Sequence, residues 1–135
     1  IILFQKVLKE NNIKSIPLKV SAPFHCSLMK PAAEKMSKKI ENINFNKSKI
    51  NIVNNVNACV EENSNKIKEL LTNQIFSTVK WRESMIYISK EGITDFIEIG
   101  PGKVLTGMVK RTIKGSNCFS INSITDMKNI NDKFK

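Results

Sequence analysis

The stretch T-D-F-I-E-I-G-P-G-K at positions 94–103 decides the fold class of this chain. Positions 94–99 predict a β-strand because β-branched and aromatic side chains dominate the run. The following Gly-Pro-Gly predicts a tight turn, since glycine and proline interrupt regular structure. Positions 103–113 then carry apolar side chains at helical spacing and predict a helix. A strand, a tight turn and a helix in this order are typical of α/β folds.

The segments on either side of this unit continue the alternation of helices and strands. Helices are predicted over residues 1–12, 27–42 and 64–74, and from about Thr78 to a cap at Gly92. Strands are predicted over residues 15–21 and 118–121, and over residues 50–56 with a break at Asn54-Asn55. The residues after Asp126 are polar and predict a tail that frays. Together these elements indicate an α/β sheet with helices on its faces.

Length and composition indicate a globular domain. A chain of 135 residues is long enough to bury a core without disulfides or metals. A hydrophobic content of 41% and a charged content of 25% exclude a disordered tail. No apolar run approaches the length of a membrane span, and no charged-then-apolar leader opens the sequence. We therefore expect no membrane partner.

The chain is strongly basic, with a formal net charge of +10 and 20 lysines against 2 arginines. Proteins that read DNA sequence use arginine forks on guanine, so this balance argues against a nucleic-acid partner. One Trp and one Tyr also leave little for base stacking. The excess of positive charge favours attraction to an acidic partner. The alternative is a compositional bias without a functional role, which the 16 asparagines beside abundant Ile and Lys also fit.

The histidine and cysteine counts disfavour metal and disulfide chemistry. Cys26, Cys59 and Cys118 lie far apart and His25 is the only histidine, so we expect no metal site and reduced thiols. His25 follows a predicted strand, where α/β folds place functional loops, although a structural histidine is the default interpretation. We do not expect a Cys–His pair, because neighbours in an extended chain point to opposite faces.

The glycine turn matches neither of two phosphate-binding patterns. Ile97 and Val104 stand where a P-loop needs Gly and Ser or Thr, and Leu105 stands where the dinucleotide pattern needs Gly. The helix N-terminus after the turn could still face an anion. A purely structural turn is the interpretation that we favour.

The predicted helix after the turn has a basic face. At about 100° per residue, Lys103, Lys110 and Lys114 fall within about 40° of one another. No acidic residue occurs between Glu98 and Asp126, so the charge is locally unbalanced. The face is either a solvated helix surface or a docking surface for an acidic partner.

Four segments carry a family resemblance. They are V-S-A-P-F-H-C-S-L-M-K-P-A-A at 20–33, I-V-N-N-V-N-A at 52–58, Gln74 with W-R-E-S-M at 81–85, and F-I-E-I-G-P-G-K-V-L-T-G at 96–107. In this order they resemble the malonyl-CoA:acyl-carrier-protein transacylase family. The first is similar to the family's catalytic-histidine segment, and the second to a buried strand with an asparagine at position 55. Acyltransferase domains of polyketide and fatty-acid synthases share part of the pattern.

The resemblance implies an α/β-hydrolase-like acyltransferase domain with a small ferredoxin-like subdomain. Residues 1–20 would be the last helix and strand of the small subdomain. Residues 21–125 would form the C-terminal part of the large subdomain, and residues 126–135 the polar tail. The implied location is the cytoplasm of a bacterium, or an organelle with bacterial-type fatty acid synthesis.

The implied reaction moves a malonyl group from malonyl-CoA to an acidic acyl carrier protein through an acyl-serine. The resemblance implies no cofactor, because the coenzyme A thioester and the carrier's phosphopantetheine are substrates. By resemblance His25 is the base, and Gln74 supplies the acceptor that fixes its tautomer. Phe24 is similar to the bulky residue of malonyl-selective members. The basic residues fit docking of the carrier protein or binding of coenzyme A phosphates; they are Lys103, Lys110, Arg111 and Lys114.

The resemblance also identifies what this sequence lacks. The family's serine lies in G-x-S-x-G, and no two glycines here are four positions apart. Arg82 and Arg111 do not match the family's malonate-binding arginine. We therefore expect a C-terminal fragment that is inactive alone. A non-catalytic basic interaction module, a remnant of a split gene and a polyketide-synthase acyltransferase domain stay open as alternatives.

Overall fold

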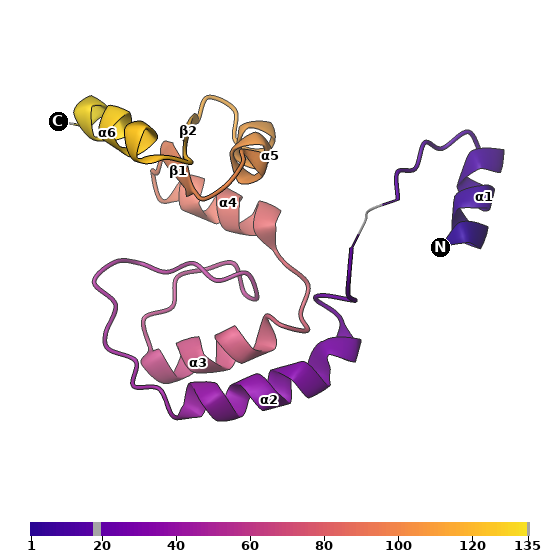
Figure 1. Cartoon of the computed structure of the whole chain (residues 1–135), viewed down its shortest axis with the longest axis horizontal. Helices are drawn as coiled ribbons and strands as arrows, with labels where there is room; N and C mark the ends of the chain where they lie inside the picture. The colour runs from indigo at the N-terminus through magenta and orange to yellow at the C-terminus, as the bar shows by residue number, and fades with distance from the viewer. Residues whose placement is uncertain (18–19, 135) are drawn as a thin grey trace.

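The computed structural model describes residues 1–17 and 20–134 as a mixed α/β structure (Figure 1). In chain order its elements are α1 (Ile2–Glu10), the short 3-10 helix η1 (Ser27–Met29), α2 (Lys30–Glu41), α3 (Ser64–Asn73), α4 (Trp81–Lys90), β1 (Asp95–Ile99), α5 (Val104–Thr112), β2 (Asn117–Ile121) and α6 (Ile124–Lys133). The predicted strand–turn–helix unit at 94–113 is confirmed as β1, the glycine turn and α5. Gly92, with φ +83°, follows the end of α4 as predicted.

The two strands form a parallel pair that α5 connects. Asp95 lies opposite Asn117 at the start of the pair, and Ile99 lies opposite Ile121 at its end. Parallel strands need a crossover between them, and α5 provides it while packing against both strands. This arrangement places the glycine turn and the start of α5 at the carboxyl edge of the sheet, where α/β folds commonly carry their sites.

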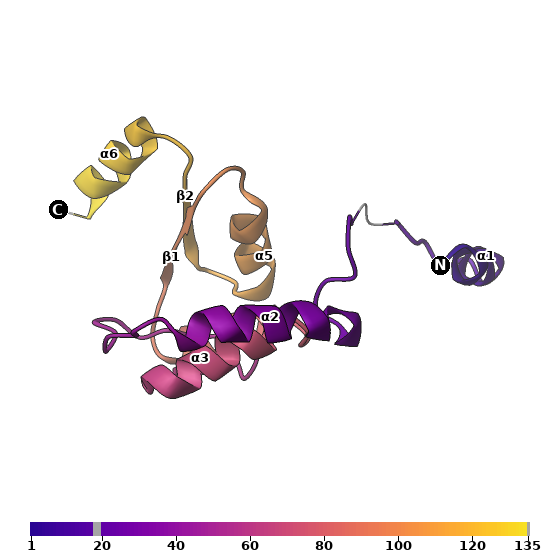
Figure 2. The same cartoon turned by 60° about the horizontal axis from the view of Figure 1, so that its bottom comes forward.

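Helices α2 and α3 pack side by side in opposite directions (Figures 1 and 2). Ala33, Ile40 and Leu70 are buried on these helices. At one end of the pair, the Lys68 Nζ atom donates to the Glu41 carbonyl oxygen at 3.3 Å. At the other end, Lys30 Nζ lies 5.9 Å from the centre of the Phe76 ring. The start of α2 therefore lies beside the turn that follows α3.

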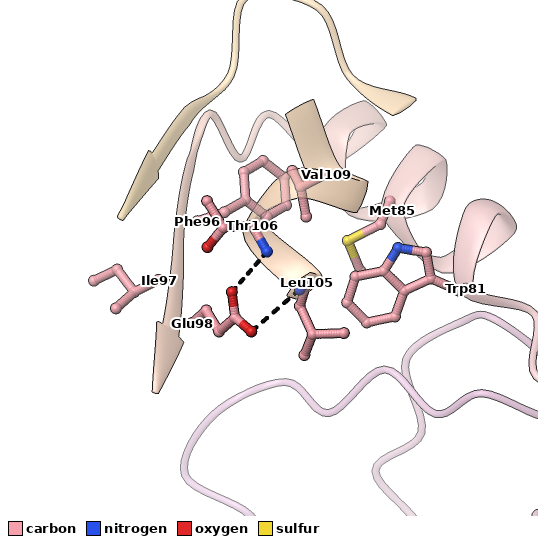
Figure 3. Close-up of a pocket in the computed structure, with 8 residues that line it drawn as sticks. All are labelled: Trp81, Met85, Phe96, Ile97, Glu98, Leu105, Thr106 and Val109. Atoms are coloured by element: carbon pink, nitrogen blue, oxygen red, sulfur yellow. Dashed lines mark hydrogen bonds between the residues drawn. The ribbon is translucent and has the colours of Figure 1, made fainter. Parts of the chain in front are cut away.

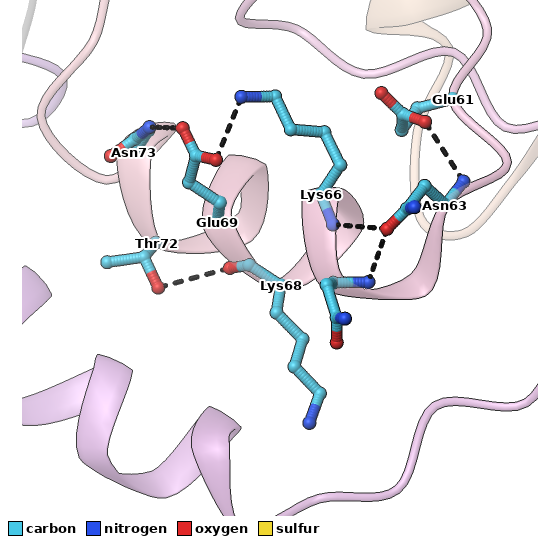
Figure 4. Close-up of polar contacts among 8 residues, drawn as sticks. Glu61, Asn63, Lys66, Lys68, Glu69, Thr72 and Asn73 are labelled. Atoms are coloured by element: carbon cyan, nitrogen blue, oxygen red, sulfur yellow. Dashed lines mark hydrogen bonds and ion pairs between the residues drawn. The ribbon is translucent and has the colours of Figure 1, made fainter.

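Side-chain hydrogen bonds set the beginning of α3 (Figure 4). The Asn63 Oδ1 atom accepts from the backbone N–H groups of Asn65 and Lys66 at 2.9 and 3.1 Å, as an N-cap residue does. Glu61 Oε1 in turn accepts from the Asn63 N–H at 2.9 Å. One turn further along, Lys66 and Glu69 form an ion pair of 2.8 Å. These contacts fix where α3 starts.

Two predicted strands are not found. Residues 50–56 contain only an isolated bridge between Val53 and Val60. The Asn54 Oδ1 atom accepts from the backbone N–H groups of Val56 and Asn57 and turns the chain at the predicted break, whereas the prediction of a strand around that break was wrong. Of the predicted strand at 15–21, residues 15–17 and 20–21 form no strand, and residues 18–19 lie outside the described residues.

The predicted fraying tail is also wrong, because residues 124–133 form α6. Ser123 caps the helix by accepting from the Asp126 N–H at 3.1 Å. The Asp126 carboxylate accepts from the Asn122 N–H and the Ser123 hydroxyl, and these bonds lower the pKa of Asp126. At its far end, Phe134 packs edge-on against Phe119 of β2, with ring centres 5.7 Å apart. The N-cap and this aromatic contact stabilise α6 even though its residues are mostly polar.

Candidate functional site

His25 lies in the loop before η1, in a backbone conformation that few residues adopt. Its φ is +58°, in the left-handed region that disfavours side chains with a Cβ atom. The Phe24 N–H donates to the Ala22 carbonyl at 2.9 Å, and the Cys26 thiol donates to the Pro23 carbonyl at 3.2 Å. The thiol of Cys26 is thus bonded within its own loop. Unfavourable backbone conformations of this kind cluster at functional sites.

The imidazole of His25 reaches a residue 49 positions away. Its Nδ1 atom lies 2.9 Å from the backbone carbonyl oxygen of Gln74. A carbonyl oxygen only accepts hydrogen bonds, so this contact places the proton of a neutral imidazole on Nδ1. The Nε2 atom is then free to accept a proton. The structure therefore brings His25 and Gln74 together, through the backbone of Gln74 and not its amide.

The α2 and α3 helices position this pair. Gln74 is the residue at which α3 ends, and its N–H donates to the Leu70 carbonyl at 2.9 Å. His25 lies in the turn just before η1 and α2. Because α2 and α3 pack antiparallel, the beginning of one lies beside the end of the other. The contact between Lys30 and Phe76 joins the same two ends.

Phe24 lies next to His25 at the protein surface. Its side chain is 55% exposed. The described residues therefore do not enclose the Phe24 ring, and the ring borders on open surface in this chain.

The first turn of α5 is capped by a carboxylate that the sequence patterns did not single out (Figure 3). The two oxygens of Glu98 accept from the Leu105 N–H at 3.1 Å and from the Thr106 N–H at 2.7 Å. Hydrogen bonding from the Thr106 hydroxyl, and then from these two N–H groups, lowers the pKa of Glu98. The sequence signal that could have predicted this cap is a glutamate at the end of a predicted strand, shortly before a predicted helix.

This cap decides between the two interpretations of the glycine turn. The Gly102 N–H donates to the Asn122 Oδ1 atom at 2.6 Å, and Glu98 accepts from the Leu105 and Thr106 N–H groups in the first turn of α5. These three amides, which could face an anion, are therefore bonded within the chain. The contacts support the favoured prediction of a structural turn.

A small cavity lies between α4, β1 and α5 (Figure 3). Its volume is about 180 Å³, and it is lined by Trp81, Met85, Phe96, Ile97, Glu98, Leu105, Thr106 and Val109. The lining is mostly apolar, and both oxygens of Glu98 are already bonded. The indole N–H of Trp81 is buried without a hydrogen-bond partner in the described part of the chain. We assign the cavity to packing between the helices and the sheet.

The predicted basic residues are exposed but do not share one helix face. Lys110 and Arg111 lie in the last turn of α5, whereas Lys103 precedes the helix and Lys114 follows its end at Thr112. The charge of Lys103 also acts on Asp126, whose pKa it helps to lower. No hydrogen bond or ion pair within residues 1–17 and 20–134 joins these side chains to His25 or Gln74.

Arg111 also borders a shallow groove between α4 and α5. Arg82, Glu83 and Met108 line the same groove. Two arginines and one glutamate therefore line this groove, next to the basic end of α5.

Within the described ranges, no cluster of three or more His, Cys, Asp or Glu side chains is arranged to hold a metal ion. None of the helices in those ranges combines the length and the apolar character needed to cross a membrane.

Curated relatives and solved structures indicate the same family for this chain. No protein-family model matches the chain. The malonyl CoA-acyl carrier protein transacylase of Escherichia coli (strain K12) is 39% identical over 114 residues, which are 84% of this chain and 37% of the relative. The enzyme of the same name from Bacillus subtilis (strain 168) is 46% identical over 110 residues, 81% of this chain and 35% of the relative.

Solved structures show the same relationship. A crystal structure of an acyl carrier protein S-malonyltransferase from Vibrio cholerae has a TM-score of 0.84 at 39% identity, over 93% of this chain and 41% of that one. A type II polyketide-synthase acyl-carrier protein in complex with its malonyl-transacylase has a TM-score of 0.86 at 34% identity, over 95% and 42%. This chain spans little more than a third of its curated relatives' length. It belongs to the malonyl CoA-acyl carrier protein transacylase family.

Proposed function

We propose that this chain is part of an acyltransferase that moves a malonyl group from malonyl-CoA to an acyl carrier protein in fatty acid synthesis. The names of its relatives support this reaction. Residues 1–20 would complete a small ferredoxin-like subdomain, and residues 21–125 would belong to the α/β-hydrolase-like large subdomain. The single observation that carries the proposal is the contact of 2.9 Å between His25 Nδ1 and the Gln74 carbonyl oxygen.

His25 would act as the base and then as the acid. Its Nε2 atom takes the proton of a serine hydroxyl as the serine oxygen attacks the thioester carbon of malonyl-CoA. The carbon–sulfur bond breaks, and Nε2 returns the proton to the leaving coenzyme A sulfur. In the second half the carrier's phosphopantetheine thiol gives its proton to Nε2 and attacks the acyl-serine. Protonation of the departing serine oxygen then restores the starting state.

Gln74 would hold the imidazole in the orientation and tautomer that this cycle needs. When Nε2 takes a proton the ring becomes a cation, and a carbonyl oxygen beside Nδ1–H stabilises that charge. Here the acceptor is a backbone group on the rigid end of α3, so it needs no particular side chain.

The serine and the arginine for the malonate carboxylate would come from the part of the family's domain that this chain does not match. The sequence contains no G-x-S-x-G, and the relatives are much longer than the matched region. We therefore expect residues 1–135 alone to transfer no malonyl group.

Phe24 would contribute to selectivity for malonyl over branched acyl groups. It stands directly before His25, at a position that resembles the bulky residue of malonyl-selective members. A single methyl group in a pocket is worth only about 1–3 kcal/mol, so the expected preference is moderate.

The basic side chains would receive the acidic carrier protein or the phosphates of coenzyme A. Lys110 and Arg111 are exposed at the end of α5, and Lys103 and Lys114 flank the helix. Exposed charges of one sign speed the encounter with a partner of opposite sign. One solved relative is a malonyl-transacylase bound to an acyl-carrier protein, which supports the carrier as the partner.

The test is a chimera in which this chain replaces the matching segment of the Bacillus subtilis transacylase. We expect the chimera to load malonyl onto acyl carrier protein, and His25→Ala to lower the rate by about 10²–10⁴-fold, as for loss of a general base. Trapped acyl-serine is measured by mass spectrometry. Full transfer by the folded His25→Ala chimera would contradict the proposal.

A further inference from the structure

Both arginines of this chain line the same groove. The sequence contains 20 lysines but only two arginines, Arg82 and Arg111. Arg82 lies in the first turn of α4 and Arg111 in the last turn of α5, and the groove between these helices has a volume of about 370 Å³. Its lining among the described residues includes no lysine. Arg82 has no part in the roles proposed above, so the proposed reaction leaves this groove unexplained.

The local structure fixes the position of Arg82. The Lys80 N–H donates to the Asn55 carbonyl at 2.9 Å, which ties the residue before α4 to the turn at 54–57. The Ser84 side chain is buried, and its hydroxyl donates to the Lys80 carbonyl at 2.8 Å. The first turn of α4 is therefore anchored to the rest of the protein, with Arg82 exposed on it.

A glycine leaves room for Arg111. Gly107 lies one turn before Arg111 on α5, and a Cβ atom at position 107 would lie 3.9 Å from the Nη1 atom of Arg111. The guanidinium therefore lies along α5, beside the backbone of Gly107. A longer side chain at position 107 would compete for this space.

Neither arginine is neutralised within the described part of the chain. Among residues 1–17 and 20–134, no ion pair or hydrogen bond joins Arg82 or Arg111 to a carboxylate. Glu83 also lines the groove, so the lining carries two positive charges and one negative charge. One positive charge is left without a counterpart. Because a guanidinium binds a carboxylate through two parallel hydrogen bonds, the groove is suited to one acidic side chain.

Apolar side chains form another part of the lining. Val79, which is 37% exposed, and Met108 border the groove together with Trp81. The hydroxyl of Thr112, which also lines it, donates to the Met108 carbonyl at 2.9 Å. Arginine, methionine and tryptophan are enriched at protein–protein interfaces, whereas a phosphate group gains nothing from an apolar wall. The groove therefore favours an amphipathic helix with an acidic side chain over a phosphate of coenzyme A.

The groove begins near the proposed catalytic pair. Val79 is five positions after Gln74, so their Cα atoms lie at most about 18 Å apart. The Ser77 N–H donates to the Asn73 carbonyl at 3.0 Å, so this segment is turned and spans less than its extended length. A carrier protein presents its thiol on a flexible phosphopantetheine arm and must dock close to His25. The short connection to Gln74 places the groove close to this pair.

We propose that Arg82 and Arg111 bind one acidic side chain on a helix of the acyl carrier protein in this groove, while Val79 and Met108 contact an apolar side chain beside it. Arg82 is then a residue that selects among carriers by the position of one carboxylate. The identity of the partner rests on the proposed function, whereas the groove and its charge do not.

The test is the affinity of residues 1–135 for the holo acyl carrier protein of Bacillus subtilis, measured by calorimetry at low salt. We expect Arg82→Glu to weaken binding by about tenfold, because the groove then repels the carboxylate. A glutamate is favourable in the first turn of a helix, so this variant should fold like the parent in circular dichroism. Lys90→Glu, an equal change of charge at an exposed position at the other end of α4, is the matched control and should change affinity less than about twofold.

Two further comparisons locate the contact. Arg82→Lys keeps the charge but loses the guanidinium fork, so its affinity should fall between those of the parent and Arg82→Glu. On the carrier, each surface Asp or Glu is replaced by Lys in turn. One of these carriers should bind the parent more weakly and bind Arg82→Glu at least about fivefold more tightly than the unchanged carrier does, as a direct charge pair requires.

Binding needs no acyl transfer, so this measurement separates failure of this proposal from failure of the proposed reaction. In the chimera with the Bacillus subtilis transacylase, Arg82→Glu should raise the KM for the carrier and leave kcat and the KM for malonyl-CoA unchanged. A chimera that transfers no malonyl group, beside a chain whose binding depends on Arg82, would contradict the reaction and support the groove.

Four outcomes would overturn the proposal. Residues 1–135 bind no carrier, Arg82→Glu binds it as the parent does, or Lys90→Glu weakens binding as much as Arg82→Glu. The fourth is that Arg82→Glu raises the KM for malonyl-CoA and not that for the carrier, which would assign the groove to the phosphates of coenzyme A.

Discussion

The Nδ1 atom of His25 lies 2.9 Å from the backbone carbonyl oxygen of Gln74, and the two residues are 49 positions apart in the chain. This contact orients the only imidazole of the protein and leaves its Nε2 atom as the proton acceptor. The acceptor belongs to the backbone at the end of α3, so the geometry depends on the helix more than on the glutamine amide.

Replacing the side chain of Gln74 should therefore have little effect. In the chimera with the Bacillus subtilis transacylase, we expect Gln74→Ala to keep the malonyl transfer rate within a few fold, because alanine retains the carbonyl oxygen. His25→Ala is the reference and should lower the rate by about 10²–10⁴-fold. A loss for Gln74→Ala as large as that for His25→Ala would show that the amide itself is needed.

The Glu98 cap predicts a pH-dependent contribution to stability. Hydrogen bonds hold the pKa of Glu98 below its ordinary value of 4.5. A carboxylate with a lowered pKa stabilises the fold above its unfolded pKa, and this stabilisation is lost as the pH falls through the folded pKa. Glu98→Gln should thus lower the melting temperature most near neutral pH, and the difference from the parent should shrink in acid.

Circular dichroism melts across this pH range check the prediction. Glu10→Gln in α1, an exposed position, is the control and should leave the melting temperature unchanged. A constant difference between Glu98→Gln and the parent from neutral pH to well below 4.5 would contradict a role for the carboxylate charge.

Charge reversal at the end of α5 should distinguish the two proposed partners of the basic residues. We expect Lys110→Glu with Arg111→Glu to raise the KM for acyl carrier protein on the order of tenfold at low salt, with a smaller effect at high salt. The KM for malonyl-CoA should stay unchanged if these side chains dock the carrier. A selective rise in the KM for malonyl-CoA would assign them to coenzyme A phosphates.

The control for this reversal lies on another helix. Lys38→Glu with Lys39→Glu changes the net charge equally at exposed positions of α2. If that pair raises the KM for the carrier as much, the effect comes from the overall charge and not from α5.

Removing the cap of α6 should loosen this helix specifically. Ser123→Ala deletes the oxygen that accepts from the Asp126 N–H, and loss of such a cap costs about 1 kcal/mol. Hydrogen exchange over residues 124–133 should become faster, while β1 and α5 keep their protection. Ser123→Asp supplies another N-cap oxygen and should restore the parent's exchange rates. Equal exchange in Ser123→Ala and the parent would mean that the contact of Phe134 with Phe119 suffices.

Most helices and the strand–turn–helix unit could be predicted from the sequence because their causes are local. Gly92 ends α4 through its positive φ, and residues 94–113 carry strand, turn and helix patterns in order. Local chemistry also explains one error. Val53 and its β-branched neighbours predict a strand, but the Asn54 side chain bonds two following amides and turns the chain. The sequence predicted a break at Asn54-Asn55, but it did not show that the turn at Asn54 would prevent the strand from forming.

For the candidate site too, the sequence predicted part of what the structure shows. The residues of the proposed catalytic pair were predicted from motif resemblance, and the proposed docking residues from their charge. The structure changes their arrangement, because α5 ends at Thr112 and leaves Lys114 beyond it. Glu98 was missed as a cap, since its role depends on where α5 lies relative to the end of β1.

The amino-acid sequence by itself determined the order of elements, the basic character and the family motifs, since periodicity, turn residues and charge act over a few positions. Only the tertiary structure decided that a backbone carbonyl orients His25, that α6 forms against β2, and that one edge of β1 is unpaired among the described residues. The physical reason is that each of these depends on groups far apart in the chain. Hydrogen bonds of strands and contacts between helices exist only once packing has brought both partners together.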